Sequence, residues 1–459
     1  MEKRFDTVIR GGTVVSGQGT VAADIGINDG RIEVVGSNIA EASAARVIDA
    51  SGQYVLPGVV DAHSHPVYDD GFEATSAGGL LGGVTTLVAY AGPNPAWGRT
   101  PNSLTESIER FLEEARKTSL TDFSLHGVVL RHDDVAPQVG NLIGMGIISF
   151  KFFMAYKKRG MMVEDYQILR VMDAVAENGG IAMVHAESGA AIDYMTDKYS
   201  AMSPVTNDLF TQVHRDLLEA EAIFRAVALA EAVNCPLYVD HVAVKEGVEV
   251  VRPLKYRLRM PLFLETCPHY LILTNEEVLR RGPLAKIGPP IRERHDNEAL
   301  WEGLRDGTID VMATDHCGIK AETKMSAAHI LEARFGAPGV QYLLPLTFSE
   351  GVRKGRISLA RMVQVLCENP AKIFGLFPRK GTLSPGSDAD VVILDPEKRQ
   401  ICSAETQVSK AGYCLYEGRE TVGTPSIVLQ RGRVLVENGS LLARPGDGRF
   451  LPGRNPIWT

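Results

Sequence analysis

The segment Val59-Val60-Asp61-Ala62-His63-Ser64-His65 joins a short apolar run to two histidines that are separated by one residue. It begins a series of eight apolar segments that alternate with helical patterns between about residues 57 and 375. These segments are Val59–Ala62, Thr85–Tyr90, Phe123–Leu130, Ile147–Phe153, Ile181–His185, Leu237–His241, Leu262–Glu265 and Asp310–Ala313. Such alternation is typical of an α/β chain folded as a TIM (β/α)8 barrel, whose active site lies at the C-terminal ends of the strands.

The stretches between these strands carry helical patterns. Ile168, Val171, Met172 and Val175 recur at helical spacing. Leu218–Val233 is long and rich in alanine, which favours a packed helix. We therefore expect helices to cover the outside of the barrel.

Both ends of the chain are rich in strand patterns. Near the N-terminus, three segments alternate or run apolar: Thr7–Val15, Ile25–Asn28 and Arg31–Val35. Val8–Val15 resembles Leu429–Val436 near the other end, and Asp388–Asp395 adds a further strand. We infer one small β-domain built from both chain ends, with the barrel inserted between them. Two unrelated hairpins are the alternative.

The composition argues against several classes of protein. The chain has 48 basic and 56 acidic residues, a net charge of −8 and no long block of like charge, so a nucleic-acid-binding or membrane-surface protein is not expected. There is neither a signal-peptide pattern nor a run of about 18 apolar residues, so no membrane span is expected. Six cysteines lie far apart without a C-x-x-C pair, which indicates reduced thiols and a cytoplasmic protein.

Side chains with metal-binding chemistry follow the predicted strands. His63 and His65 share one side of their strand, because residues i and i+2 point the same way. His185, His241 and Asp315 stand at the ends of three further strands. A single histidine at a strand end often only binds a loop, but this set together predicts a metal site. Imidazoles and a carboxylate without a thiolate suit Zn²⁺, with Mn²⁺, Fe²⁺ or Co²⁺ as alternatives.

Lys151 interrupts the apolar run Ser149–Tyr156. Burying a charged amine costs free energy unless the charge is compensated or removed. One interpretation is a buried carboxylate partner for the ammonium group. The other is a neutral amine that has reacted with carbon dioxide, because the resulting carbamate is anionic and its two oxygens can bridge two cations.

The chain resembles the cyclic amidohydrolases of the amidohydrolase superfamily, in particular the dihydropyrimidinase and hydantoinase branch. The resemblance covers nearly the whole chain through motifs in fixed order: Val55–His65, Ser149–Tyr156, Glu265–Leu271, Thr314–Cys317, Lys380–Thr382 and Gly386–Asp390. It implies a barrel over residues 57–375 and a small β-sandwich from residues 1–56 and 376–445. It also implies a C-terminal arm over 446–459 that extends along a neighbouring subunit of a homotetramer or dimer.

The resemblance assigns a role to each candidate residue. His63, His65 and Asp315 would bind the more buried of two divalent metal ions, His185 and His241 the more exposed one, and Lys151, as N6-carboxylysine, would bridge both. A hydroxide between the metals would attack the carbonyl of a cyclic amide or imide. Asp315 would move the proton to the ring nitrogen, and Tyr156 would donate to the developing oxyanion.

The sequence indicates the substrate less directly than it indicates the metal site. Dihydroorotases use an arginine shortly after the H-x-H pair, whereas this chain has Pro66-Val67-Tyr68, so an orotate-like ring is not expected. Allantoinases resemble the chain at Cys267–Tyr270 and Gly339–Gln341, but they lack the spacing of Lys151 and Tyr156. Gly288 and Phe335 stand where hydantoinases usually have serine and asparagine. Tyr68 and Phe153 are candidates for contacting the substituent on the ring, or they pack the wall.

We predict a hydrolase that opens a hydantoin or dihydropyrimidine ring, a small-molecule substrate. An allantoinase or another lactam or imide amidohydrolase is the alternative. A catalytically inactive scaffold like the collapsin-response proteins, which share the fold but have lost metal ligands, is a remote alternative because the complete ligand set is present here.

Overall fold

The centre of the molecule is an eight-stranded sheet in the order β8-β9-β10-β11-β12-β13-β14-β15. The computed structural model describes residues 4–41, 44–93, 103–130 and 134–458. Every neighbouring pair of strands in this sheet is parallel. The strands are β8 (Val59–Ser64), β9 (Val84–Ala91), β10 (Asp122–Val128), β11 (Ser149–Phe153), β12 (Ile181–His185), β13 (Leu237–Val239), β14 (Leu262–Thr266) and β15 (Val311–Met312). Each predicted barrel strand is thus present, and the predicted TIM barrel is confirmed.

The barrel closes beside the H-x-H pair. The segment after β15 pairs with the end of β8 through a parallel bridge between Ser64 and His316. The backbone N–H of His65 donates to the His316 carbonyl oxygen at 2.8 Å. The side chain of Asp61 in β8 accepts from the backbone N–H of Thr314 at 3.0 Å and from its hydroxyl at 2.6 Å. Closure therefore brings the first and last strands, and the polar residues that follow them, together.

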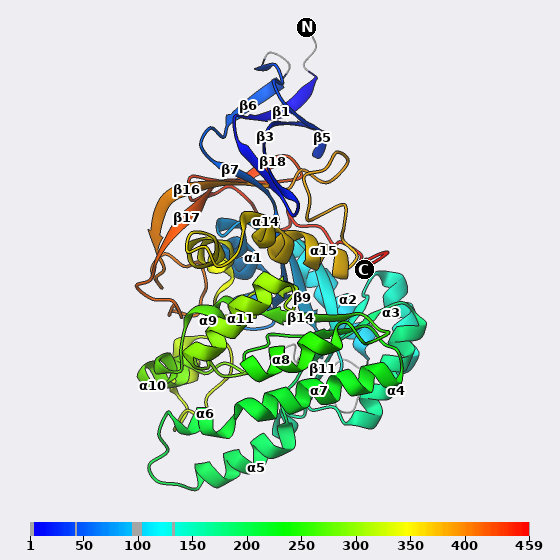
Figure 1. Ribbon diagram of the computed structural model, residues 1–459, viewed down its shortest axis with the longest axis vertical. Coiled ribbons are helices and arrows are strands. Elements are labelled where there is room, and N and C mark those ends of the chain that lie inside the picture. The colour runs from blue at the N-terminus through cyan, green and yellow to red at the C-terminus, as the bar shows by residue number, and fades with distance from the viewer. Residues whose placement is uncertain (1–3, 42–43, 94–102, 131–133, 459) are drawn as a thin grey trace.

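Helices cover the outside of the barrel (Figure 1). Strands such as β9 and β12 are buried along their whole length, because the barrel interior and the helix layer cover their two faces. The buried face of α4 consists of Ile168, Val171, Met172 and Val175, as their spacing predicts. The helices are α1 (Gly71–Leu81), α2 (Leu104–Thr118), α3 (Val139–Met145), α4 (Asp165–Glu177), α5 (Gly189–Ser200), α6 (Leu209–Val213), α7 (Asp216–Ala232), α8 (Lys245–Leu254), α9 (Pro268–Ile272), α10 (Glu276–Arg281), α11 (Arg294–Asp306), α12 (Ala321–Met325), α13 (Leu343–Leu346), α14 (Leu359–Val363) and α15 (Asn369–Ile373). Among the residues described, no helix is long and apolar enough to cross a membrane.

Two sheets from the chain ends lie together at one end of the molecule (Figure 1). The seven-stranded sheet has the order β19-β18-β17-β16-β7-β2-β3 and mixes both ends of the chain. Its strands are β2 (Thr13–Ser16), β3 (Gly19–Ala22), β7 (Tyr54–Pro57), β16 (Val391–Ile401), β17 (Glu420–Gln430), β18 (Arg433–Glu437) and β19 (Ser440–Leu441). The four-stranded sheet, β5-β4-β1-β6, comes from the N-terminal end alone. Its strands are β1 (Phe5–Arg10), β4 (Asp24–Asn28), β5 (Arg31–Gly36) and β6 (Ala44–Asp49).

One predicted strand is wrong. Thr7–Val15 is not continuous: β1 ends at Arg10, β2 begins at Thr13, and the two strands belong to different sheets. The chain turns at Gly11, whose φ of 70° lies in the left-handed region that glycine adopts without a side-chain clash. The apolar alternation continues through the turn, so the pattern alone does not reveal it.

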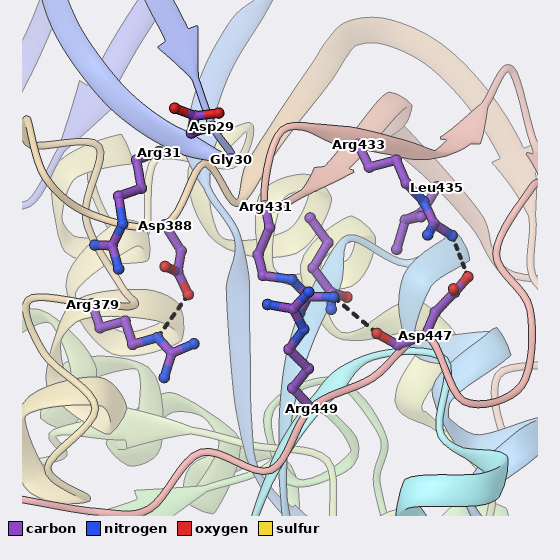
Figure 2. A pocket seen from close by; sticks show the side chains of 11 residues that line it. Asp29, Gly30, Arg31, Arg379, Asp388, Arg431, Arg433, Leu435, Asp447 and Arg449 are labelled. Atoms are coloured by element: carbon purple, nitrogen blue, oxygen red, sulfur yellow. Dashed lines mark hydrogen bonds and ion pairs between the residues drawn. The ribbon is translucent and has the colours of Figure 1, made fainter.

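A buried ionic cluster joins the terminal sheets to the barrel. The Lys380 ammonium donates to Asp122, at the start of β10, and to Asp390, just before β16, each at 2.7 Å. Arg431, in the β17–β18 turn, also pairs with Asp122. Beside this cluster is a pocket in which Arg379 pairs with Asp388 and Arg433 with Asp447 (Figure 2). None of the predicted site residues lines that pocket.

The C-terminal segment runs along the barrel of its own chain. Phe123 in β10 exchanges backbone hydrogen bonds with Arg449 and Leu451 at 2.9 and 2.7 Å. The N–H groups of Gly453 and Arg454 donate to Gly146 and Gly375, both at 2.9 Å. The sequence predicts an arm over 446–459 that extends along a neighbouring subunit. These contacts hold residues 449–454 against the barrel of the same chain, and the extension along a neighbouring subunit stays a prediction.

Candidate metal centre

The predicted site residues line one pocket at the C-terminal ends of the barrel strands. All eleven are there: His63, His65, Tyr68, Lys151, Phe153, Tyr156, His185, His241, Gly288, Asp315 and Phe335. The same pocket is lined by four residues that sequence reasoning missed, namely Arg159, Met161, Cys317 and Gly336. Three of these four lie within three residues of a predicted site residue, so extending each motif by three residues would have included them. Met161 lies five residues after Tyr156 and carries no chemical signal.

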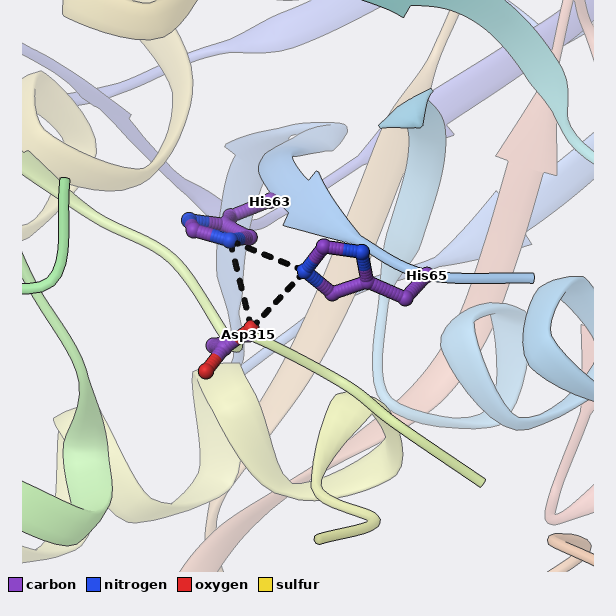
Figure 3. A group of neighbouring side chains, drawn as sticks. All are labelled: His63, His65 and Asp315. Atoms are coloured by element: carbon purple, nitrogen blue, oxygen red, sulfur yellow. Dashed lines mark hydrogen bonds and ion pairs between the residues drawn. The ribbon is translucent and has the colours of Figure 1, made fainter. Parts of the chain in front are cut away.

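His63, His65 and Asp315 form a compact triangle (Figure 3). The Nε2 atoms of His63 and His65 are 3.2 Å apart, and Oδ1 of Asp315 lies 3.2 and 3.0 Å from them. Three donors bonded to one ion at about 2.0–2.2 Å would lie roughly 3 Å from one another. The triangle therefore has the spacing of a ligand set around a single cation.

A second pair of donors comes from β12 and the end of β13. Nδ1 of His185 lies 3.0 Å from Nε2 of His241. The side chain of His65 is 15% exposed and that of His185 is 2% exposed. Which set holds the more buried cation stays a prediction.

Carboxylates behind the histidines orient their rings. Glu265 accepts from Nδ1 of His63 at 2.7 Å, and Glu187 accepts from Nε2 of His185 at 2.7 Å. Each ring then turns its other nitrogen toward the pocket, the arrangement in which histidine ligands are usually held. Burial disfavours a charged His63, but Glu265 and Asp315 raise its pKa to about 10 in the absence of a cation. The donor set thus fits metal binding, with a partner for each of these two rings.

Lys151 lies among these groups and is 1% exposed. Its ammonium pairs with Asp240, which also accepts from the Tyr90 hydroxyl at 3.2 Å. The amine lies 5.0 Å from the centroid of the Phe153 ring. The unmodified lysine thus has the buried carboxylate partner that one of the two sequence interpretations requires.

Three site residues have a left-handed backbone. Their φ angles are 66° for Tyr156, 37° for His241 and 46° for Asp315. This region costs a residue with a side chain about 1 kcal/mol or more, and such residues gather at functional sites. Here the turns direct the side chains into the pocket directly after the strands end.

Tyr156, Gly288 and Phe335 fill one side of the pocket. The rings of Tyr156 and Phe335 meet edge to face with centroids 5.2 Å apart. A Cβ atom on Gly288 would overlap the Tyr156 hydroxyl and lie 2.9 Å from Cδ1 of Phe335. Burial and the Glu187 carboxylate raise the pKa of Tyr156 well above its ordinary value, so the phenol stays protonated. The glycine thus leaves room for both aromatic side chains.

His316 is a further residue that sequence reasoning left without a role. Its Nε2 donates to Asp70 at 2.9 Å, and its Nδ1 accepts from the Gly339 N–H at 3.0 Å. Asp70 also accepts from the backbone N–H of Lys410 at 2.6 Å. These contacts fix the backbone next to Asp315. Two residues that lie 246 positions apart form this pair, so spacing does not predict it.

Comparison with known proteins agrees with this geometry. The model of the amidohydrolase family matches residues 54–434. The chain belongs to the amidohydrolase family. Its similarity to the D-hydantoinase of Ralstonia pickettii is 37% identity, covering 98% of this chain and 99% of that protein. The chain is 33% identical to the L-hydantoinase of Paenarthrobacter aurescens, over 98% of this chain and 99% of that protein.

Solved structures give the same result. A D-hydantoinase structure superposes with a TM-score of 0.92 at 37% identity, covering 98% of this chain and 99% of that one. The dihydropyrimidinase of Brevibacillus agri superposes with a TM-score of 0.93 at 31% identity, also covering 98% and 99%. The resemblance inferred from the sequence motifs, to a cyclic amidohydrolase of the hydantoinase branch, is confirmed.

The fit around Gly288 can be tested. Gly288→Ala should lower kcat for hydrolysis by about 10²-fold, because the new methyl group displaces the Tyr156 hydroxyl by a large part of an ångström. Steady-state kinetics on the metal-loaded protein measures this. Gly144→Ala is the matched control, since a Cβ there meets nothing within 4 Å. Wild-type kcat in Gly288→Ala would show that the crowding is relieved without moving Tyr156.

Proposed function

We propose that this protein hydrolyses a C–N bond in a cyclic amide or imide of the hydantoin or dihydropyrimidine type. The observation that carries the proposal is the convergence of two donor groups on one buried lysine. The triangle of His63, His65 and Asp315 and the pair of His185 and His241 face the same pocket as Lys151. The fold and the names of the relatives support this reaction class over the inactive scaffold.

Two divalent cations fit these donors, and zinc is the proposed metal, with manganese, iron or cobalt as alternatives. When bound, they supply an activated water and polarise the carbonyl group. Lys151, as N6-carboxylysine, would supply oxygen ligands to both cations. The carboxylation replaces the ammonium charge, so Asp240 then needs another partner, and the Tyr90 hydroxyl already donates to it at 3.2 Å.

The remaining steps belong to side chains of the pocket. Asp315 stands between the two histidine rings and accepts the proton of the nucleophile, then delivers it to the departing ring nitrogen. Tyr156, whose ring lies 4.8 Å from that of His185, donates its hydroxyl hydrogen to the oxyanion as the tetrahedral centre forms. Gly288 and Phe335 shape the cavity around the ring, and Tyr68 and Phe153 line the side on which its substituent lies.

A homotetramer or dimer in the cytoplasm remains our expectation. It rests on the family resemblance and on the cysteine pattern. All six cysteines are buried and none forms a disulfide.

Turnover tests the proposed function directly. Metal-loaded protein should open hydantoin, 5-substituted hydantoins or dihydrouracil to the corresponding N-carbamoyl acids, which chromatography detects. Allantoin and dihydroorotate complete the set. Turnover of allantoin alone would replace the proposal with an allantoinase. Absence of bound metal together with absence of turnover would favour the inactive scaffold.

The bridging role of Lys151 predicts the metal content. Lys151→Ala should lose both metal ions and all measurable turnover, because each cation loses a ligand. Elemental analysis of the purified variant, next to its thermal unfolding, measures this. Lys117→Ala is the control, since Lys117 forms an exposed pair with Glu113 on α2. Two bound metals and full activity in Lys151→Ala would disprove the bridge.

The role of Tyr156 predicts a change in rate without a change in metal. Tyr156→Phe removes one hydrogen-bond donor to the oxyanion, which should lower kcat by about 10²–10³-fold. Metal content should stay near that of the wild type, because the phenol is not a ligand. Unchanged kcat would show that another group stabilises the oxyanion.

A further inference from the structure

Arg159 stands at the edge of the candidate active site. It is the last residue of η4 (Lys157–Arg159), the short helix that follows Tyr156, and it lines the same pocket as the metal-binding residues. Its guanidinium carbon lies 5.5 Å from the centroid of the Tyr156 ring and 5.9 Å from that of Phe335. The cation therefore lies against the two aromatic side chains that shape the substrate cavity.

This arginine has no counter-ion among the residues that the structure describes. Lys158, its neighbour on η4, pairs with Asp197. Within the pocket, Lys151 pairs with Asp240, and Asp315 lies against His63 and His65. The Arg159 guanidinium is thus the one full charge of this lining that the described residues leave unpaired.

A second arginine adjoins a residue of the pocket. Arg334 is exposed, directly precedes Phe335, and likewise forms no ion pair within the described part of the chain. Both arginines lie close enough to the Tyr68 hydroxyl to oppose the rise in its pKa that burial causes. Arg159 lines the pocket itself, and Arg334 adds a second positive charge from the loop that carries Phe335.

We propose that Arg159, assisted by Arg334, binds a carboxylate on the ring substituent, so that the preferred substrates are cyclic amides with an acidic side chain. The inference rests on the proposed function and names its substrate class. A guanidinium presents two parallel N–H donors that match a carboxylate, and both arginines are exposed, so an incoming substrate can reach them. The segment after the H-x-H pair, Pro66-Val67-Tyr68, holds no arginine, whereas this cation comes from the loop after β11.

The alternative role for Arg159 is packing. A cation over aromatic rings stabilises their positions. That role affects substrates of either charge equally. A comparison of two substrates that differ only in charge separates it from carboxylate binding.

The experiment uses hydantoin-5-acetic acid and its primary amide, which have nearly the same size. The metal-loaded wild type should show at least a tenfold higher kcat/KM for the acid. In Arg159→Gln the acid-to-amide ratio of kcat/KM should fall by about 10–100-fold, the usual effect of losing a hydrogen bond to a charged group. Arg334→Gln should lower the ratio less, and added salt should lower it in the wild type because exposed charges are screened.

Lys158→Gln is the matched control, because it removes a charge from the same short helix where the lysine is already paired. Its ratio should equal that of the wild type. Equal kcat/KM for acid and amide in the wild type, or an unchanged ratio in Arg159→Gln, would overturn the inference while the proposed function stands. If neither compound is opened, and hydantoin and dihydrouracil are not opened either, the proposed function fails and this inference fails with it.

Discussion

The burial of ionisable side chains at the mouth of an apolar barrel is the constraint on which the site depends. A charge removed from water is tolerated only with a close partner. Here a layer of carboxylates lies behind the donors: Glu265 behind His63, Glu187 behind His185 and Asp240 beside Lys151. The same contacts that compensate the charges also set the direction of each ring, so stability and ligand geometry come from one network.

The chain's order of strands, and the residues that end them, could be predicted from the sequence. Eight apolar runs and the polar residues that follow them are enough to predict the barrel and the location of its site, because the C-terminal ends of parallel barrel strands all lie at one rim. The partners could not be predicted in the same way. Asp240 lies 89 residues after Lys151, and the order of the sheet makes them neighbours across β12. The missed turn at Gly11 has the same origin, since the apolar alternation does not record which sheet a strand joins.

The other features that the sequence does not predict lie in the loops around the pocket. In the sequence, Gly288 and Phe335 are two separate departures from the family pattern. In the structure they are in contact, and the absence of a side chain at Gly288 makes room for the aromatic ring of Phe335. Arg159 belongs to a basic run of three residues, Lys157–Arg159, a pattern that is typical of a solvated surface. Its neighbour Lys158 has the ordinary surface role, and only three-dimensional placement separates the two.

The mixed sheet of the two chain ends has a consequence for synthesis. During synthesis, β2 is available to pair with one edge of β7 from the start. The partner of its other edge, β16, begins at Val391, roughly 330 residues after β7 ends at Pro57. At about 5–20 residues per second, a ribosome needs on the order of 20–70 s to supply that partner. During this time the nascent chain carries an open strand edge while its barrel is still emerging. The order of synthesis therefore leaves this edge free to pair with another chain until β16 emerges.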